Sequence, residues 1–271
     1  MAKRDYKMQL NDYAHRAKNI LRHNTKYQID KNIINAIFSE TENIEDKVIA
    51  RLSVIDSFYS TQMNKRLWGI EEICASINDL SEDDNEVKNL AIEFVDNSTV
   101  ESKIFNLITK KYGYKKNGQP FGKASSLITK YLYFITNYQF PIYDSLVRTS
   151  YCDLQIRFPD FNLPNLLNDC DINFFHSIKT LNSVSLIMNY DFLDNLLWLY
   201  GKIKQGSFSL IFQQDIYLRL VSLAGVNNLK GNVDQAIRNY LQNHINEHQI
   251  DNLLSNDFVL FFNFCFENNA I

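Results

Sequence analysis

Glycine and proline are scarce in this chain, with 8 Gly and 4 Pro among its 271 residues. Because both residues mark turns, their scarcity favours long helices over many short strands. Apolar residues make up 45% of the sequence, and Phe (19) and Tyr (15) are abundant among them. This apolar content excludes a disordered protein and is enough for a sizeable core.

Cysteine is infrequent as well, and the four cysteines lie far apart, at Cys74, Cys152, Cys170 and Cys265. The sequence has no CxxC spacing and no Cys/His cluster, which argues against a zinc site or an iron–sulfur centre. His244 and His248 have helical spacing, but no Glu motif accompanies them, so a solvated helix face is the better interpretation. We therefore expect no metal and no cofactor, and a reduced, cytoplasmic location.

Long apolar runs are missing too. None reaches the roughly 18 residues that a membrane-spanning helix requires, so we expect no membrane partner. The N-terminal sequence MAKRDYKMQLNDYAHR carries basic residues but lacks the apolar stretch of a secretory signal.

Overall positive charge is absent, since the formal net charge is −3, but the basic residues are unevenly distributed. Residues 1–31 carry eight Lys or Arg against three acids, and residues 101–135 carry seven Lys against Glu101 alone. Lys115 and Lys116 crowd a turn in the second segment. A chain with this distribution can present one basic face, which a DNA phosphate backbone requires.

Helical spacing of apolar residues runs through most of the chain and predicts an all-α fold. The expected helices cover residues 6–23, 30–40, 45–60, 64–77, 86–96, 102–111, 123–135, 144–151, two within 172–204, 207–224, 231–247 and 250–266. The clearest break is the glycine-rich stretch 112–122, where we expect a hairpin near 112–121. We expect one unit over 1–271, with approximate lobes 45–111 and 112–271 and N-terminal helices 1–44 packed on them.

Two short segments carry candidate chemistry. Gly122-Lys123-Ala124 places a lysine at the start of a predicted helix, and Pro141-Ile142-Tyr143-Asp144-Ser145 places an aspartate at the N-cap of the next one. An amine near a helix N-terminus in a partly desolvated pocket is more easily neutral. Beside a carboxylate, it can attack a sugar carbon and expel the base, once the base has been flipped out of the duplex.

With these segments the sequence resembles the helix–hairpin–helix DNA glycosylases, and most of all the 8-oxoguanine glycosylases and bacterial proteins of that fold. The similarity covers about residues 45–151 and includes the helix ending in Ser60-Thr61-Gln62. It implies a two-lobed helical fold with a cleft between the lobes, Lys123 and Asp144 as catalytic residues, and damaged double-stranded DNA as the partner of a monomer. The other site residues that we expect are Gln62, Asn64, Lys115, Lys116 and Gly122 as DNA contacts and Tyr131, Phe140 and Tyr143 in the base pocket.

The sequence departs from the family pattern in two places. The family hairpin reads Gly-apolar-Gly, whereas Gln119-Pro120-Phe121-Gly122 keeps only the last glycine. A second lysine, Lys130, follows Lys123 by seven positions on the same predicted helix, so it is an alternative functional amine.

Three hypotheses follow. The first is a DNA glycosylase, with or without lyase activity, that removes a damaged or modified base. The second is a DNA-binding protein that keeps the fold without the chemistry. The third is a helical scaffold that binds a protein partner through the apolar tail 250–266.

Overall fold

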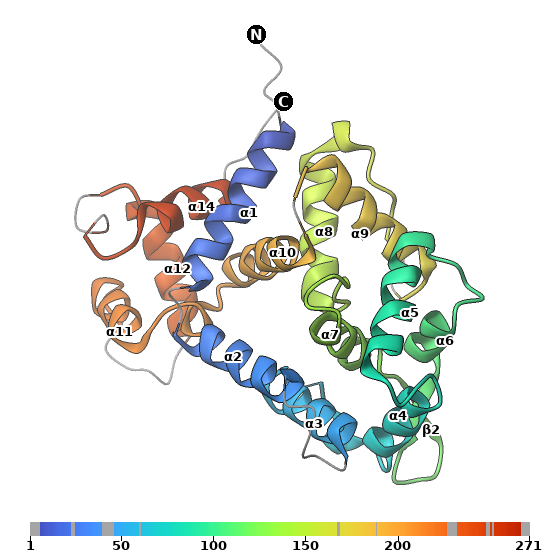
Figure 1. Ribbon diagram of the computed structural model, residues 1–271. Helices are drawn as coiled ribbons and strands as arrows, with labels where there is room; N and C mark the ends of the chain where they lie inside the picture. The colour runs from blue at the N-terminus through green and yellow to red at the C-terminus, as the bar shows by residue number, and fades with distance from the viewer. Residues whose placement is uncertain are drawn as a thin grey trace.

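The computed structural model describes residues 6–22, 25–39, 46–59, 61–166, 169–187, 189–226, 232–247, 250 and 252–266. Across these residues the protein is mostly helical and has a single two-stranded hairpin (Figure 1). The all-α prediction is confirmed. The structure says nothing of Lys3 and Arg4 in the predicted basic N-terminus, of residues 40 to 45, or of His248, because they lie outside the described ranges.

Among the described residues before the hairpin, the helices are α1 (Tyr6–Arg22), α2 (Thr25–Ser39), α3 (Lys47–Tyr59), α4 (Gly69–Asn78), α5 (Asp84–Asn97) and α6 (Lys103–Thr109). A short 3-10 turn, η1 (Met63–Lys65), lies between α3 and α4. Strands β1 (Lys111–Tyr114) and β2 (Pro120–Lys123) then pair antiparallel, with Lys111 opposite Lys123. The expected hairpin is therefore confirmed, and its strands extend slightly beyond the predicted stretch.

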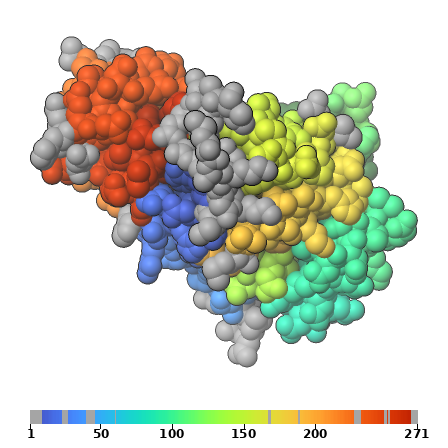
Figure 2. Space-filling view, turned by 90° about the horizontal axis from the view of Figure 1, so that it is seen from above, coloured from blue at the N-terminus to red at the C-terminus, as the bar shows by residue number. Residues whose placement is uncertain are grey.

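The second half is again helical: α7 (Ser125–Ile135), α8 (Ser145–Arg157), α9 (Ile172–Val184), α10 (Tyr190–Gln205), α11 (Gln214–Leu223), α12 (Val233–His244) and α14 (Asn256–Phe266). The 3-10 turns η2 (Pro159–Phe161) and η3 (Phe208–Leu210) interrupt it. In Figure 2 the C-terminal helices gather at one end of the molecule and α4–α6 at the other, with α8 and α9 between them.

Helix α10 lies at the centre and packs on α1, α8 and α14 (Figure 1). Its approach to α8 is close because Gly201 has no side chain: a Cβ there would lie 2.5 Å from Leu146 Cδ1 and 2.6 Å from Ser150 Oγ. This contact holds the first turn of α8 against the face of α10 that carries Trp198 and Lys202.

Two expectations change with the structure. Lys123 does not open a helix, because its backbone completes the β1–β2 ladder and α7 begins at Ser125. The tail forms α14 as the expected final helix, and it buries Phe258, Phe261 and Phe262 in the core, which removes them from the partner surface of the third hypothesis. Within the described residues, no helix combines the length and the apolar character needed to cross a membrane.

Candidate active site

Lys130 and Asp144 meet because the loop after α7 folds back on that helix. Asn137 and Tyr138 take up left-handed backbone conformations and end α7. The chain then returns along the helix, where the Tyr143 N–H donates to Thr129 Oγ1 at 3.0 Å. Since Thr129 precedes Lys130 and Tyr143 precedes Asp144, this single hydrogen bond brings the two charged residues side by side.

The Lys130 amine is almost completely enclosed, with 4% of its side chain exposed. It donates to Ser126 Oγ at 2.8 Å and to Asp144 Oδ2 at 3.2 Å. The Tyr59 ring lies 5.3 Å from its Nζ, close enough for a cation–π contact. A lysine held so firmly beside a carboxylate is a positioned group and not a solvated surface cation.

Asp144 is the N-cap of α8, as the sequence predicts, and its Oδ1 accepts from the Val147 N–H at 2.8 Å. Burial alone would raise the pKa of this carboxyl. Lys130 and the N–H groups of Val147 and Leu146 overcome that effect and hold the pKa below its ordinary value. Asp144 is therefore ionised at neutral pH, with 23% of its side chain open to the space above it.

That space is a cleft of about 650 Å³ formed by α2, α3, α7, α8, α10 and η3. Lys130 and Asp144 lie in its wall, and five aromatic side chains join them: Tyr27, Phe58, Tyr59, Tyr143 and Trp198. Arg148 and Lys202 also line it. The cleft thus combines an amine and a carboxylate with aromatic walls and flanking positive charge, a combination suited to a flipped base on a phosphate backbone.

The structure separates Lys123 from Asp144. Lys123 Nζ lies 2.5 Å from Asp169 Oδ2 and 3.4 Å from the Cys170 carbonyl, and its side chain is 31% exposed. The hydrogen bond from Lys123 lowers the pKa of Asp169. The predicted pairing of Lys123 with Asp144 is therefore wrong, because strand pairing directs Lys123 to the segment before α9, and the alternative amine Lys130 takes its place.

The remaining predicted site residues divide between the cleft, the core and the surface. Tyr143 and Gln62 line the cleft. Tyr131 and Phe140 are completely buried in the core, so they do not form the walls of an open pocket as expected. Asn64, Lys115 and Lys116 are exposed, while the Gly122 carbonyl accepts from the Arg66 guanidinium at 2.6 Å.

Asp194 on α10 is a residue that the sequence analysis missed. Its partly buried carboxylate makes no hydrogen bond or ion pair with any described residue. Burial, together with the negative charge of Asp144, raises the pKa of Asp194 to about 7, although Lys31 and Lys130 act in the opposite direction. One carboxyl is thus kept ionised, while the other can gain or lose a proton near neutral pH, an arrangement typical of acid–base sites.

The raised pKa of Asp194 predicts a pH-dependent stability. The folded protein keeps a proton that the unfolded chain releases above about pH 4, so stability falls as pH rises from there through about 7. In Asp194→Asn this loss is absent. We expect the variant to match the wild type in melting temperature at pH 4 and to exceed it by about 10 °C at pH 8, a gain on the order of 4 kcal/mol. If the difference in melting temperature between the variant and the wild type is the same at both pH values, the raised pKa of Asp194 is excluded.

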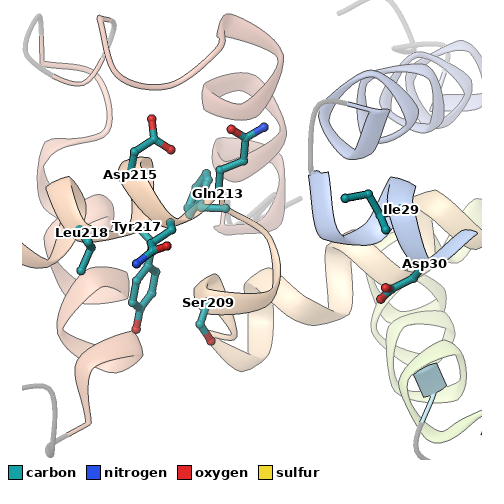
Figure 3. A pocket seen from close by; sticks show the side chains of 9 residues that line it. Ile29, Asp30, Ser209, Gln213, Asp215, Tyr217 and Leu218 are labelled. Atoms are coloured by element: carbon teal, nitrogen blue, oxygen red, sulfur yellow. The ribbon is translucent and has the colours of Figure 1, made fainter. Parts of the chain in front are cut away.

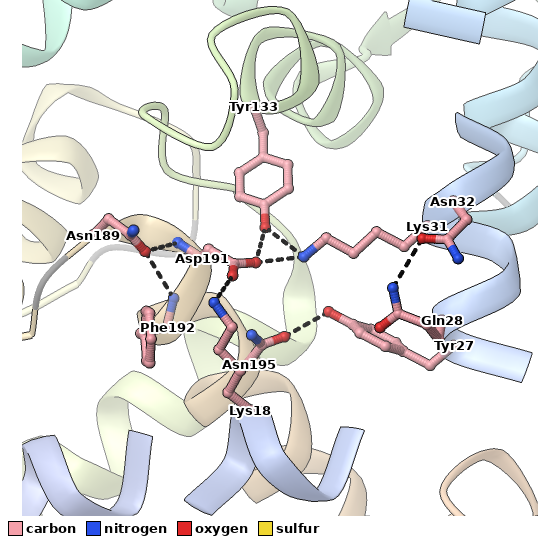
Figure 4. Close-up of polar contacts among 10 residues, drawn as sticks. All are labelled: Lys18, Tyr27, Gln28, Lys31, Asn32, Tyr133, Asn189, Asp191, Phe192 and Asn195. Atoms are coloured by element: carbon pink, nitrogen blue, oxygen red, sulfur yellow. Dashed lines mark hydrogen bonds and ion pairs between the residues drawn. The ribbon is translucent and has the colours of Figure 1, made fainter. Parts of the chain in front are cut away.

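A buried ionic cluster is centred on Asp191, three positions before Asp194 on α10 (Figure 4). The Asp191 carboxylate accepts from Lys31 on α2 and from Tyr133 on α7 at 2.8 Å, and Lys18 on α1 lies 3.0 Å from its second oxygen. Burial opposes ionisation of Asp191, but Lys31 and Lys18 lower its pKa. The cluster therefore joins α1, α2, α7 and α10 through one carboxylate.

A second hollow, of about 880 Å³, lies between α2 and the η3–α11 segment (Figure 3). Asp30 and Ile29 of α2 face Ser209, Gln213 and other side chains across it. It shares Asp30 with the cleft but holds no amine–carboxylate pair among its lining residues. We therefore place the candidate chemistry in the cleft that contains Lys130.

Comparison with known proteins returns no match for this chain among protein-family models, curated proteins or solved structures.

Proposed function

We propose that this chain is a DNA glycosylase with an associated lyase step, in which Lys130 is the nucleophile and Asp144 stabilises the cationic sugar. We further propose that the fold is a two-lobed, helix–hairpin–helix glycosylase-like one whose cleft receives the damaged base. The observation that carries the proposal is the enclosed Lys130 amine, 3.2 Å from an ionised carboxylate in the wall of an aromatic-lined cleft. The sequence resemblance supports the class of enzyme and the role of Asp144, whereas the choice of Lys130 over Lys123 rests on the geometry alone.

The chemistry can be written with these residues. Lys130 must lose a proton before it attacks, and we assign Asp194, on whose pKa of about 7 the charge of Lys130 acts, as the group that accepts this proton. The amine lone pair then forms a bond to C1′ of the sugar while the bond from C1′ to the base breaks. The departing base takes that electron pair and a proton. Asp144 stabilises the positive charge that develops on the sugar.

The lyase step follows from the covalent sugar–amine adduct. Loss of a proton from nitrogen and opening of the sugar ring, with a proton added to the ring oxygen, convert the adduct into an imine. Loss of a C2′ proton from the protonated imine then expels the 3′ phosphate and breaks the strand. Borohydride reduces the imine to a stable secondary amine, which makes the intermediate measurable.

Basic groups around the cleft support a DNA partner. Arg148 and Lys202 line the cleft itself, and Lys115 and Lys116 are exposed at the tip of the hairpin. Because each neutralised phosphate releases counterions, we expect duplex affinity to fall steeply with salt. Reversing the charge of Lys115 and Lys116 weakens binding to all sequences alike.

The experiment that tests the proposal offers the protein a panel of duplexes, each with one 8-oxoguanine, uracil, alkylated base or abasic site. We expect base release from at least one damaged duplex, seen as strand breaks after hot alkali, and strand breaks without alkali at the abasic site. Salt-dependent binding with no base release and no strand breaks on any duplex would refute the enzyme and support the hypothesis of a DNA-binding protein. Absence of binding would support the hypothesis of a helical scaffold.

A further inference from the structure

A small aromatic surface projects where α4 meets the hairpin, at the lower right of Figure 1. It consists of Leu67, Trp68 and Tyr114, here called the aromatic knuckle. Trp68 is 63% exposed, Leu67 41% and Tyr114 39%, and the rings of Trp68 and Tyr114 meet edge to face with centroids 6.5 Å apart. Exposed apolar residues that cluster in this way indicate an interaction surface more strongly than single ones do.

The knuckle is held rigidly. Leu67 and Tyr114 exchange backbone hydrogen bonds of 3.0 and 3.1 Å, which attach the segment before α4 to strand β1. The Arg66 guanidinium donates to the carbonyls of Gly122 at 2.6 Å and Lys123 at 2.8 Å, so the second strand is attached as well. A ligand that binds here therefore meets side chains whose backbone is already ordered, which lowers the entropy cost of binding.

The backbone at the knuckle is also costly to maintain. Trp68 has a φ of 58°, in the left-handed region that bulky residues rarely occupy. Six residues earlier Gln62, which lines the cleft, has a φ of 64°. The same short segment thus connects the candidate active site to the knuckle, with an unfavourable backbone conformation at each end.

The segments that form the knuckle are rich in positive charge. Segment 111–123 carries four lysines, of which Lys123 is paired with Asp169, and no acidic residue of its own. Segment 61–70 carries Lys65 and Arg66 and no acidic residue. In the first turn of α4, Glu72 is engaged by the Gly113 N–H at 2.7 Å, which leaves Glu71 as the other carboxylate there. Flat exposed rings among lysines fit a single-stranded nucleic acid, whose bases stack on aromatic faces while cations follow the phosphates.

We propose that the aromatic knuckle is a stacking platform for an unpaired base of DNA bound at the cleft, with Trp68 as the main stacking surface. This proposal rests on the proposed function in one respect, which is that the bound nucleic acid is DNA. Gln62 in the cleft wall and Trp68 in the platform are six positions apart, so at most about 20 Å of chain separates them and one DNA strand can reach both.

Tryptophan fluorescence tests the platform, because the chain contains only 2 Trp and Trp198 lies in the cleft. In Trp198→Phe the emission reports on Trp68 alone. Undamaged single-stranded DNA, a duplex with a 3′ overhang and a blunt duplex are titrated separately. We expect quenching with the first two and little change with the blunt duplex.

Affinity measurements on matched variants complete the test. Trp68→Ala should bind the overhang duplex about tenfold more weakly, with blunt-duplex affinity unchanged, and Trp68→Phe should keep most of the affinity because a ring remains. Ile156→Ala, which removes an exposed apolar side chain from α8, should bind as the wild type does. The platform would be overturned if no DNA quenches the Trp68 emission. It would also be overturned if Trp68→Ala loses affinity equally for the blunt and the overhang duplex.

Failure of the platform can be distinguished from failure of the proposed enzyme. The DNA in these titrations is undamaged, so no result depends on base release. If the wild type releases a damaged base but the Trp68 fluorescence is not quenched by any DNA, the stacking platform is refuted and the glycosylase proposal stands. If overhang DNA quenches Trp68 but no damaged duplex loses its base, the glycosylase proposal is refuted. The protein is then a DNA-binding protein with this stacking site.

Discussion

Lys130→Gln is expected to abolish covalent capture of abasic DNA by borohydride and to slow base release by at least about 1,000-fold, because it removes the attacking amine. Gln keeps a polar group beside Ser126 and Asp144, so much of the local hydrogen bonding survives. DNA affinity should change little, since this contact is one among many. Single-turnover rates, gel capture and binding curves on the same preparation measure the three quantities.

Lys123→Gln is the matched control for that variant. Lys123 lies only seven positions from Lys130, but its amine pairs with the exposed Asp169. We expect wild-type capture and base release, with a small stability change, because exposed ion pairs contribute about 0–1 kcal/mol. Loss of capture in Lys123→Gln with full activity in Lys130→Gln would return the assignment to Lys123.

Asp191→Asn is expected to destabilise the fold by about 3 kcal/mol, because it leaves the buried Lys31 amine without its counter-charge. For a chain of this size the melting temperature should fall by about 9 °C. Asp12→Asn breaks an exposed pair with Arg16 and should change it by less than about 2 °C. A drop in Asp191→Asn no larger than in this control would contradict the role of the cluster.

The pH dependence of the Asp191→Asn effect gives a second check. Since its lysine partners lower the pKa of Asp191, the stability from this carboxylate is fully present above the ordinary carboxyl pKa, about 4. It is lost as pH falls through the lowered pKa. The difference between wild type and variant should therefore be constant from pH 5 to 8 and shrink in stronger acid.

The helices, the hairpin and the Asp144 cap could be predicted from the sequence because their signals are local. Apolar spacing gives the helix faces, glycines give the hairpin, and an Asp before an apolar turn gives the cap. The choice between Lys123 and Lys130 could not be predicted, because it depends on contacts between distant segments. Lys123 is held by its strand pairing and by Arg66, and Lys130 by the return of the Tyr143 segment onto Thr129.

Asp194 and the knuckle were missed for the same reason. Asp191, Asp194 and Trp198 have helical spacing along α10, which indicates a common face but not what lies opposite it. The charges that act on Asp194 come from α2, α7 and α8. The sequence around Trp68 does not indicate that its side chain is exposed, because a tryptophan with apolar neighbours such as Leu67 and Ile70 is more often part of a core.

The central claim is that the Lys130 amine forms a covalent bond with the sugar, and peptide mapping of the captured adduct tests it most directly. Wild-type protein is incubated with a duplex containing one abasic site, reduced with borohydride and digested, and the modified peptide is identified by mass spectrometry. We predict that the reduced sugar is found on Lys130. Its presence on Lys123, or the absence of any adduct under conditions in which the duplex is bound, would contradict the account.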